Sequence, residues 1–271
     1  MAKIKICLDA GHYGKYNQSP ANKAYYESVM VWKLHLKLKA ELEKYGFEVI
    51  TTRPKQAENR GLESRGQASK GCDLFVSIHS NAVGNYVKES VDYPVAYVCL
   101  DGKADVIGKK LADCVQETMG TTQNGRISKR VNDSGKDYYG VIRGAASVGT
   151  PALILENSFH TNTKSTNWLL VDANLSKLAK KQAAVLAEYY GLTKNETVYN
   201  VSYMVRIDVS EIYDKCLNIR EKPDGNSKKT GCIIEDMSLT IIQEAKDVNG
   251  NLWGKLKSGV GWIRLSYTKR I

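Results

Sequence analysis

Short apolar runs alternate with stretches of helical spacing through roughly the first 190 residues of this chain. The apolar runs, each typical of a buried strand, lie at residues 4–9, 47–52, 74–78, 95–100 and 152–155. Between them, apolar side chains recur every three or four positions over residues 27–45, 105–119 and 175–190. This alternation predicts an α/β domain with a mostly parallel twisted sheet flanked by helices.

The pattern changes after residue 192. A polar stretch over residues 193–203 is typical of a linker. Beyond it, short strand-like runs separated by turn-forming residues lie at 216–220, 232–234, 239–242, 252–256 and 261–265. The sequence therefore predicts an α/β domain over residues 1–192 and a small all-β barrel over residues 204–271.

Charge and hydropathy limit the classes of partner. The chain of 271 residues has a formal net charge of +10, which favours an anionic partner such as an acidic cell-wall polymer, or simply solubility. Lysine and arginine are spread along the chain without interleaved aromatic residues, so we expect no nucleic acid partner. No apolar run approaches the roughly 18 residues needed to span a bilayer, so we expect no membrane insertion.

The cysteines and the first residues bear on where the protein is made. None of the six cysteines forms a C-x-x-C pair, and we expect a reducing compartment with few or no disulfides. The first strand begins by Ile4, which leaves no room for an export signal of roughly 15–30 residues. We therefore expect synthesis in the cytoplasm without a signal peptide.

Histidine and glutamate side chains follow the apolar runs at the points where they stop. His12, His79 and Glu156 each lie at or just past the end of a predicted strand. Because functional groups collect beyond the carboxyl ends of parallel strands, we expect these side chains to lie close together. Two histidines and one glutamate can hold zinc and leave one coordination position open, as hydrolytic sites do.

Glu27 begins a predicted helix and precedes Val31, a residue of the apolar stripe, by four positions. Residues at i and i+4 share a helix face, so the carboxylate of Glu27 is expected to face the core. A buried carboxylate is costly unless it is paired, and a metal ion would offset that cost. A carboxylate favoured by the helix dipole and a buried ion pair remain alternatives. His35 is expected at the surface or rim, and His160, four residues after Glu156, is a candidate substrate-binding residue.

Four segments, in order, carry a resemblance to a known family. The strings LDAGHYG, YYESVMVWKLHLKLKAELEKYGFEVITTR, DLFVSIHSNA and PALILENSFHTN resemble zinc N-acetylmuramoyl-L-alanine amidases, the large family of bacterial autolysins and many phage endolysins, over residues 3–190. The resemblance implies that His12, Glu27 and His79 hold one Zn²⁺ ion and that Glu156 is the catalytic carboxylate. His160 stands where the family usually has an aliphatic residue.

The end of the chain carries a second resemblance. The strings LNIREKPDGNSKKTGCI, LTII, NLWGKL and GVGWIRLSY resemble a bacterial SH3-like module over residues 204–271, which implies cell-wall binding. Trp253 and Trp262 are expected to pack this small barrel, with ligand stacking as the alternative.

Together these features predict a peptidoglycan hydrolase that cleaves the amide between N-acetylmuramic acid and L-alanine of the stem peptide. The expected partners are the peptidoglycan of a Gram-positive wall and its anionic polymers. We expect a phage endolysin that reaches the wall after holin-type release or lysis, with an autolysin or a sporulation enzyme as alternatives. The segment 120–140 is expected to be a long loop beside the substrate. A zinc peptidase acting within the stem peptide and an inactive wall-binding protein are competing hypotheses.

Overall fold

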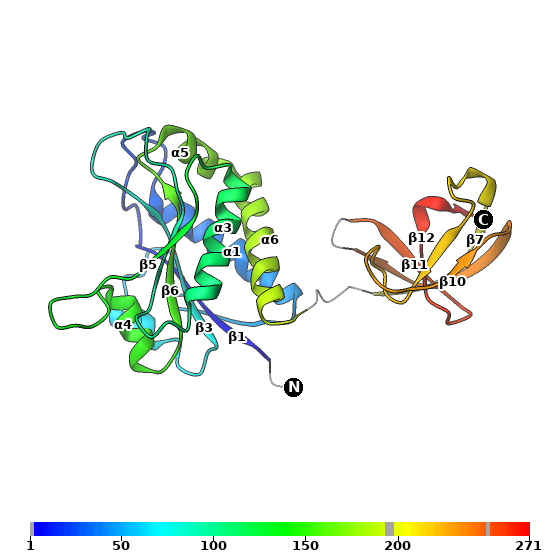
Figure 1. Cartoon of the computed structure of the whole chain (residues 1–271), viewed down its shortest axis with the longest axis horizontal. Helices are drawn as coiled ribbons and strands as arrows, with labels where there is room; N and C mark the ends of the chain where they lie inside the picture. The colour runs from blue at the N-terminus through cyan, green and yellow to red at the C-terminus, as the bar shows by residue number, and fades with distance from the viewer. Residues whose placement is uncertain (1–2, 193–197, 248–249) are drawn as a thin grey trace. The chain divides into compact units, whose positions relative to one another are not determined.

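The computed structural model describes residues 3–192, 198–247 and 250–271. Its contacts divide the chain into two compact units, Met1–Thr193 and Lys194–Ile271. The α/β elements all belong to the first unit and the all-β elements to the second (Figure 1). The expected boundary at residue 192 lies next to this division.

The first unit is built on a six-stranded sheet with the order β2-β1-β3-β6-β4-β5. Its strands are β1 (Lys5–Ala10), β2 (Glu48–Thr51), β3 (Leu74–Asn81), β4 (Val95–Val98), β5 (Arg126–Ser128) and β6 (Ala152–Phe159). All neighbouring pairs are parallel except β4 and β6, so the sheet is mixed rather than simply parallel. The chain returns from β3 to β4 without a crossover helix, and such a return places β4 antiparallel to its neighbour.

Helices cover both faces of this sheet (Figure 1). They are α1 (Glu27–Lys44), α2 (Leu62–Gln67), α3 (Asp105–Met119), α4 (Gly140–Ser147), α5 (Thr163–Leu170) and α6 (Asp172–Tyr189). Helices α1, α3 and α6 pack together on one face, whereas α2 and α4 pack on each other and α4 contacts β6. Helices α4 and α5 have no counterpart among the helices predicted from the sequence. None of the helices in the described parts of the chain is long and apolar enough to cross a membrane.

Two glycines allow α2 and α4 to touch through their backbones. A Cβ atom on Gly66 would lie 2.1 Å from the carbonyl oxygen of Val141, and one on Gly144 would lie 2.1 Å from that of Glu63. Any side chain at either position would push the helices apart. Helix α4 leads directly into β6, so this contact also fixes the start of that strand.

The segment 120–140 differs from the long loop that we expected beside the substrate. Residues 126–128 form β5 on the outer edge of the sheet. Lys136 and Asp137 line a hollow of about 560 Å³ with Glu63 and Arg143, and Leu100 borders it as well. Because β4 runs antiparallel to β6, Leu100 lies near the amino end of β6. This part of the segment therefore lies at the opposite end of the sheet from Glu156.

The second unit is an all-β sheet with the order β13-β7-β10-β11-β12-β8-β9, and all its neighbouring strands are antiparallel. The strands are β7 (Tyr199–Ile207), β8 (Leu217–Arg220), β9 (Lys229–Ile233), β10 (Met237–Lys246), β11 (Leu252–Leu256), β12 (Trp262–Arg264) and β13 (Lys269–Arg270), with 3-10 turns at Val209–Glu211 and Leu265–Tyr267. Trp253 and Trp262 are buried together with Ala245, as packing residues are. The predicted β domain is thus present as a separate unit.

The predicted linker over residues 193–203 is wrong at its end. Residues 199–203 belong to β7, which pairs with β10, and residues 193–197 lie outside the described part of the chain. Several side chains of β7 face solvent and are polar, so this strand lacks the continuous apolar run by which other strands were recognised.

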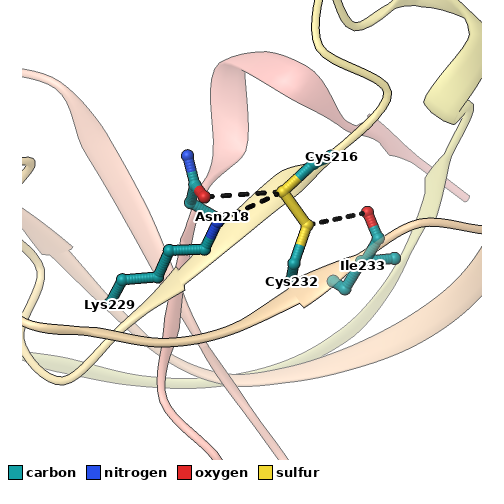
Figure 2. Close-up of a disulfide and its surroundings, with 5 residues drawn as sticks. All are labelled: Cys216, Asn218, Lys229, Cys232 and Ile233. Carbon is teal, nitrogen blue, oxygen red and sulfur yellow. Dashed lines mark hydrogen bonds between the residues drawn. A yellow bond between two sulfur atoms is a disulfide. The ribbon is translucent and has the colours of Figure 1, made fainter.

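The cysteines divide between the two units. Cys216 and Cys232 form a disulfide that joins the start of β8 to β9 in the second unit (Figure 2). The cysteines of the first unit are free and buried: Cys7, Cys72, Cys99 and Cys114. We expected few or no disulfides in the chain, and the described residues contain this one, between Cys216 and Cys232.

Candidate metal centre and active site

The first part of the site forms where β1 ends. The backbone N–H of Gly11 donates to the carbonyl oxygen of Ile78 (3.0 Å), which ties this end of β1 to β3. His12 follows with a positive φ of 55°. A Cβ atom on Gly11 would lie 2.3 Å from Cε1 of His79. Only glycine at this position lets the two imidazole rings approach, and their centroids are 5.0 Å apart.

Glu27 enters the site from the first turn of α1. Its side chain is buried, with 1% of the residue exposed, as its spacing from Val31 predicted. The N–H of Glu27 donates to the carbonyl oxygen of Asn17 (2.9 Å), and the hydroxyl of Ser28 donates to that of Gly14 (2.8 Å). The loop before α1 is thereby fastened to the helix start, which determines where the carboxylate points.

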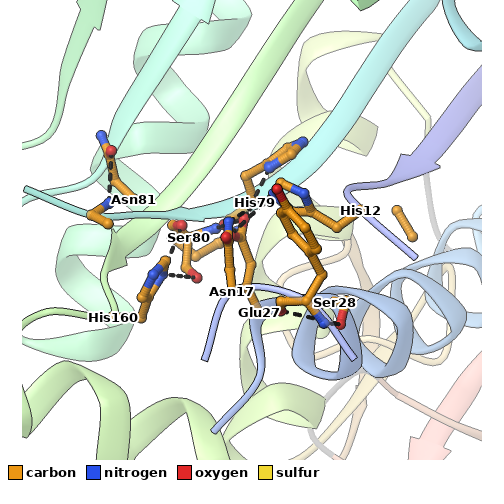
Figure 3. Close-up of polar contacts among 12 residues, drawn as sticks. His12, Asn17, Glu27, Ser28, His79, Ser80, Asn81 and His160 are labelled. Carbon is orange, nitrogen blue, oxygen red and sulfur yellow. Dashed lines mark hydrogen bonds and ion pairs between the residues drawn. The ribbon is translucent and has the colours of Figure 1, made fainter. Parts of the chain in front are cut away.

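His12, Glu27 and His79 meet at one point, as Figure 3 shows. Oε2 of Glu27 lies 3.1 Å from Nε2 of His12, and Oε1 lies 2.9 Å from Nδ1 of His79. One candidate ligand atom from each residue lies within 4.8 Å of the others. Two ligand atoms at about 2.1 Å from a tetrahedral zinc ion are about 3.4 Å apart. This donor set therefore fits zinc once the histidine nitrogens move slightly away from the carboxylate oxygens of Glu27.

The protonation state of Glu27 suits a metal ligand. Burial alone would raise the pKa of this carboxyl, but the hydrogen bonds and charges of His12 and His79 outweigh burial and hold the pKa well below its usual range. Glu27 is therefore a carboxylate at neutral pH. The side chains of His12 and His79 keep 25% and 16% of their surface exposed, so the cluster is open on the histidine side.

Glu156 lies on β6 beside the cluster. In the parallel pairing of β3 with β6 it stands opposite His79, and a bulge follows at once, with Ser158 at a φ of +62°. Oε2 of Glu156 is buried and has no hydrogen-bond partner among the described residues. Burial and then the nearby charge of Glu27 raise the pKa of Glu156 well above its usual value. This acid thus differs from Glu27 in its affinity for a proton.

The other two histidines are both buried. His160 is buried, with 4% exposure, and its Nδ1 lies 2.9 Å from both the hydroxyl and the carbonyl oxygen of Ser80. His35 was predicted at the surface or rim, and that prediction is wrong. It is buried at 2% exposure beside Trp32, because the covered face of α1 is wider than its leucine stripe.

With this geometry established, comparison with known proteins decides the family. Residues 6–188 match the protein family described as N-acetylmuramoyl-L-alanine amidase. The chain belongs to this amidase family. Its members are peptidoglycan amidases, so the amidase acts on peptidoglycan.

Relatives of the amidase include N-acetylmuramoyl-L-alanine amidase CwlM of Bacillus licheniformis, which is 28% identical over 198 residues, or 71% of each chain. Cwp6 from Clostridium difficile has a similar fold, with a TM-score of 0.61 and 22% identity over 69% of this chain. The chain covers only 29% of Cwp6. The catalytic domain of CwlV from Bacillus (Paenibacillus) polymyxa has a TM-score of 0.59 and 21% identity over 70% of this chain and 99% of its own. These two structures support the fold.

Sequence reasoning missed two residues that hold Glu27 of the amidase. The side-chain Nδ2 of Asn17 donates to Oε2 of Glu27 (2.7 Å), and the backbone N–H of Ser80 donates to Oε1 (3.0 Å). Asn17 lies in a polar loop without periodicity, and a backbone donor has no signature in the sequence. Only the position of Ser80, directly after a candidate ligand, gave a hint.

Proposed function

We propose that this chain is a zinc-dependent amidase that hydrolyses the bond between the lactyl group of N-acetylmuramic acid and L-alanine of the stem peptide. One observation carries the proposal. Two partly exposed imidazoles converge on a buried carboxylate, and a second glutamate stands opposite His79 with a buried oxygen that has no partner among the described residues. Family membership gives the substrate class.

His12, Glu27 and His79 would hold the zinc ion. When bound, zinc polarises a carbonyl group and makes water more acidic. The ionised carboxylate of Glu27 would offset part of the charge of the ion, and the two histidines would supply ring nitrogens as its other ligands. Asn17 and the backbone of Ser80 keep the carboxylate oriented through their hydrogen bonds to it.

Glu156 would move the proton. An amide resists water because water is a weak nucleophile and the amine is a poor leaving group. Oε2 of Glu156 would take a proton from the attacking water and then give it to the departing amine of L-alanine. Burial and the charge of Glu27 raise the pKa of Glu156, which would favour its holding the proton between the two steps.

The products of digestion test this proposal. Purified peptidoglycan would be incubated with the chain, with and without a zinc chelator, and the fragments identified by mass spectrometry. The expected fragments are stem peptides with a free L-alanine amino group and glycan with an intact lactyl group, formed only without chelator. A new amino terminus within the stem peptide would show a peptidase instead, and unchanged peptidoglycan would show an inactive wall-binding protein.

We also propose that the second unit, with the resemblance of its motifs to SH3-like modules, binds a Gram-positive wall. The net charge of +10, which is that of the whole chain, supports attraction of the chain to anionic wall polymers. Binding of the full chain to purified walls would be measured with and without teichoic acids. If the attraction is electrostatic, binding falls as salt rises from low to about 0.5 M and falls again when the polymers are removed.

The proposed biological role is that of a phage endolysin made in the cytoplasm and released to the wall by holin-type membrane holes or by lysis. The resemblance of the catalytic motifs to endolysins and autolysins supports this role. Expression in a Gram-positive host tests it directly. Lysis is expected only after the membrane is permeabilised, whereas lysis of growing cells without permeabilisation would favour an autolysin.

A further inference from the structure

The buried polar contacts of His160 show which of its ring nitrogens carries the hydrogen. Nδ1 lies 2.9 Å from the carbonyl oxygen of Ser80, and a carbonyl oxygen can only accept. Nδ1 therefore carries a hydrogen and donates it to Ser80, with the hydroxyl of Ser80 also at 2.9 Å. Burial lowers the pKa of His160, so the ring is neutral at neutral pH. Its face stacks on Tyr25, with centroids 5.7 Å apart.

Ser80 connects this histidine to the metal centre. It follows His79 directly on β3, and its N–H donates to Oε1 of Glu27 (3.0 Å). Its hydroxyl lies 2.7 Å from the hydroxyl of Tyr25, a fully buried residue just before α1. In Figure 3 the dashed contacts run from His160 to Ser80. Ser80 is thus held through both its hydroxyl and its carbonyl, while its N–H holds a ligand.

The backbone of His160 ties β6 to β3 as well. Its N–H donates to the carbonyl oxygen of Asn81 (2.8 Å). Its carbonyl oxygen accepts from the hydroxyls of Ser19 (2.5 Å) and Thr166 (2.9 Å). These bonds lie just beyond the bulge that follows Glu156, so they close the irregular part of the strand pair.

From these contacts we propose that His160 is a positioning residue, which acts through Ser80 to hold Glu27 and His79 in register with Glu156. The inference rests on the proposed function, since it assigns His160 to the zinc site and the base proposed there. Burial of the ring favours this role over the substrate contact expected from the sequence. An aliphatic side chain at this position could not donate to Ser80.

The test compares two substitutions in the full-length chain. His160→Phe keeps an aromatic ring against Tyr25 and removes the donor, whereas His160→Asn keeps a donor of similar reach. Zinc affinity would be measured by competition with a chelator, and kcat and KM with soluble peptidoglycan fragments. We expect His160→Phe to weaken zinc binding about 10- to 100-fold and to lower kcat with little change in KM. His160→Asn should recover most of both losses.

A matched control separates positioning from general core damage. His35 is also a buried histidine whose Nδ1 contacts a backbone carbonyl, that of Trp32 at 3.0 Å, but it lies farther along α1. We expect His35→Phe to lower thermal stability and leave zinc affinity unchanged. If His160→Phe does not fold, Tyr25→Phe is the alternative variant. It removes only the Tyr25 hydroxyl that contacts the hydroxyl of Ser80, and it should weaken zinc binding about fivefold.

The outcomes distinguish the two proposals. Wild-type zinc affinity and kcat in a folded His160→Phe variant overturn the positioning role. Wild-type zinc affinity in Tyr25→Phe overturns its premise, that contacts to Ser80 hold the metal ligands. Equal losses of zinc affinity in His160→Phe and His35→Phe also overturn it. If the wild-type chain itself binds no zinc, the proposed function fails before the role of His160 is reached.

Discussion

The side-chain nitrogen Nδ2 of Asn17 lies 2.7 Å from Oε2 of Glu27, so a residue of an exposed loop holds the buried carboxylate of the candidate metal centre. We predict that Asn17→Ala weakens zinc binding about tenfold, because the carboxylate loses an orienting partner. Chelator competition would measure the change. Asn22→Ala in the same loop is the control, since Asn22 bonds to Asn167 instead (2.8 Å). Equal zinc affinity in both variants would contradict the prediction.

Glu156→Gln should abolish proton transfer without removing the zinc ion. The amide keeps the size of the side chain but cannot accept and return a proton. We expect kcat to fall at least about 10²- to 10⁴-fold while zinc stays bound. Product release and metal content would be measured on the same preparation. A variant that keeps a near-normal rate would remove Glu156 from the proposed mechanism.

Gly11→Ala should damage the site through shape alone. The added methyl group would lie 2.3 Å from the ring of His79, so that ring must move from its place in the site. We expect loss of zinc binding at micromolar concentrations, measured by metal analysis after dialysis. Gly61→Ala is a suitable control, because a Cβ atom there meets nothing within 4 Å. Full zinc occupancy in Gly11→Ala would show that the ring can be displaced without cost.

Acid should weaken the first unit through Asp9. Burial favours its neutral form, but the charge and hydrogen bonds of Arg65 outweigh burial and lower the pKa of Asp9. A lowered folded-state pKa means that this stabilisation is complete above the unfolded pKa of about 3.9 and is lost as the pH falls below it.

Urea unfolding at several pH values tests this role of Asp9. We expect Asp9→Asn to lower the free energy of unfolding at pH 7 by about 3–5 kcal/mol, because Arg65 stays buried without its partner. The variant should also lose less stability than the wild type between pH 5 and about pH 3. An identical acid dependence in both proteins would exclude Asp9 as its source.

The disulfide should stabilise only the second unit. Cys216 and Cys232 are 16 residues apart, and closing a loop of that length is worth about 3 kcal/mol. Reduction should speed hydrogen exchange over residues 199–247 and leave residues 3–192 unchanged. A Cys216→Ser/Cys232→Ser variant should exchange fast with or without reductant. No effect of reductant on the wild type would exclude this stabilisation.

The helix and strands that carry the candidate site were predictable from the sequence where hydrophobic periodicity and side-chain chemistry agree. The i, i+4 spacing of Glu27 and Val31 predicted a core-facing carboxylate, and Glu27 is buried. The ends of the apolar runs predicted that His79 and Glu156 lie at the carboxyl ends of strands in one sheet. The two residues are register partners in the pairing of β3 with β6.

The features that were not predicted from the sequence depend on contacts between distant segments of the chain. Strand β4 is antiparallel to β6 because no crossover helix connects β3 to β4. The side-chain pattern of β4 itself does not indicate the direction of the strand. The partly exposed strand β7 looked like a linker because its stability comes from pairing with β10. The donors to Glu27 from Asn17 and Ser80 arise only once loop, helix and strand have met.

The place of β6 in the sheet has a consequence for synthesis. It is the last strand of the first unit along the chain, yet it lies between β3 and β4 and carries Glu156. A growing polypeptide that ends before residue 152 lacks both this inner strand and the proposed base. Strand pairings of such long sequence separation are slow to form. On the mechanism proposed above, such a partial chain would be inactive on peptidoglycan, because the proposed base is added only when β6 is made.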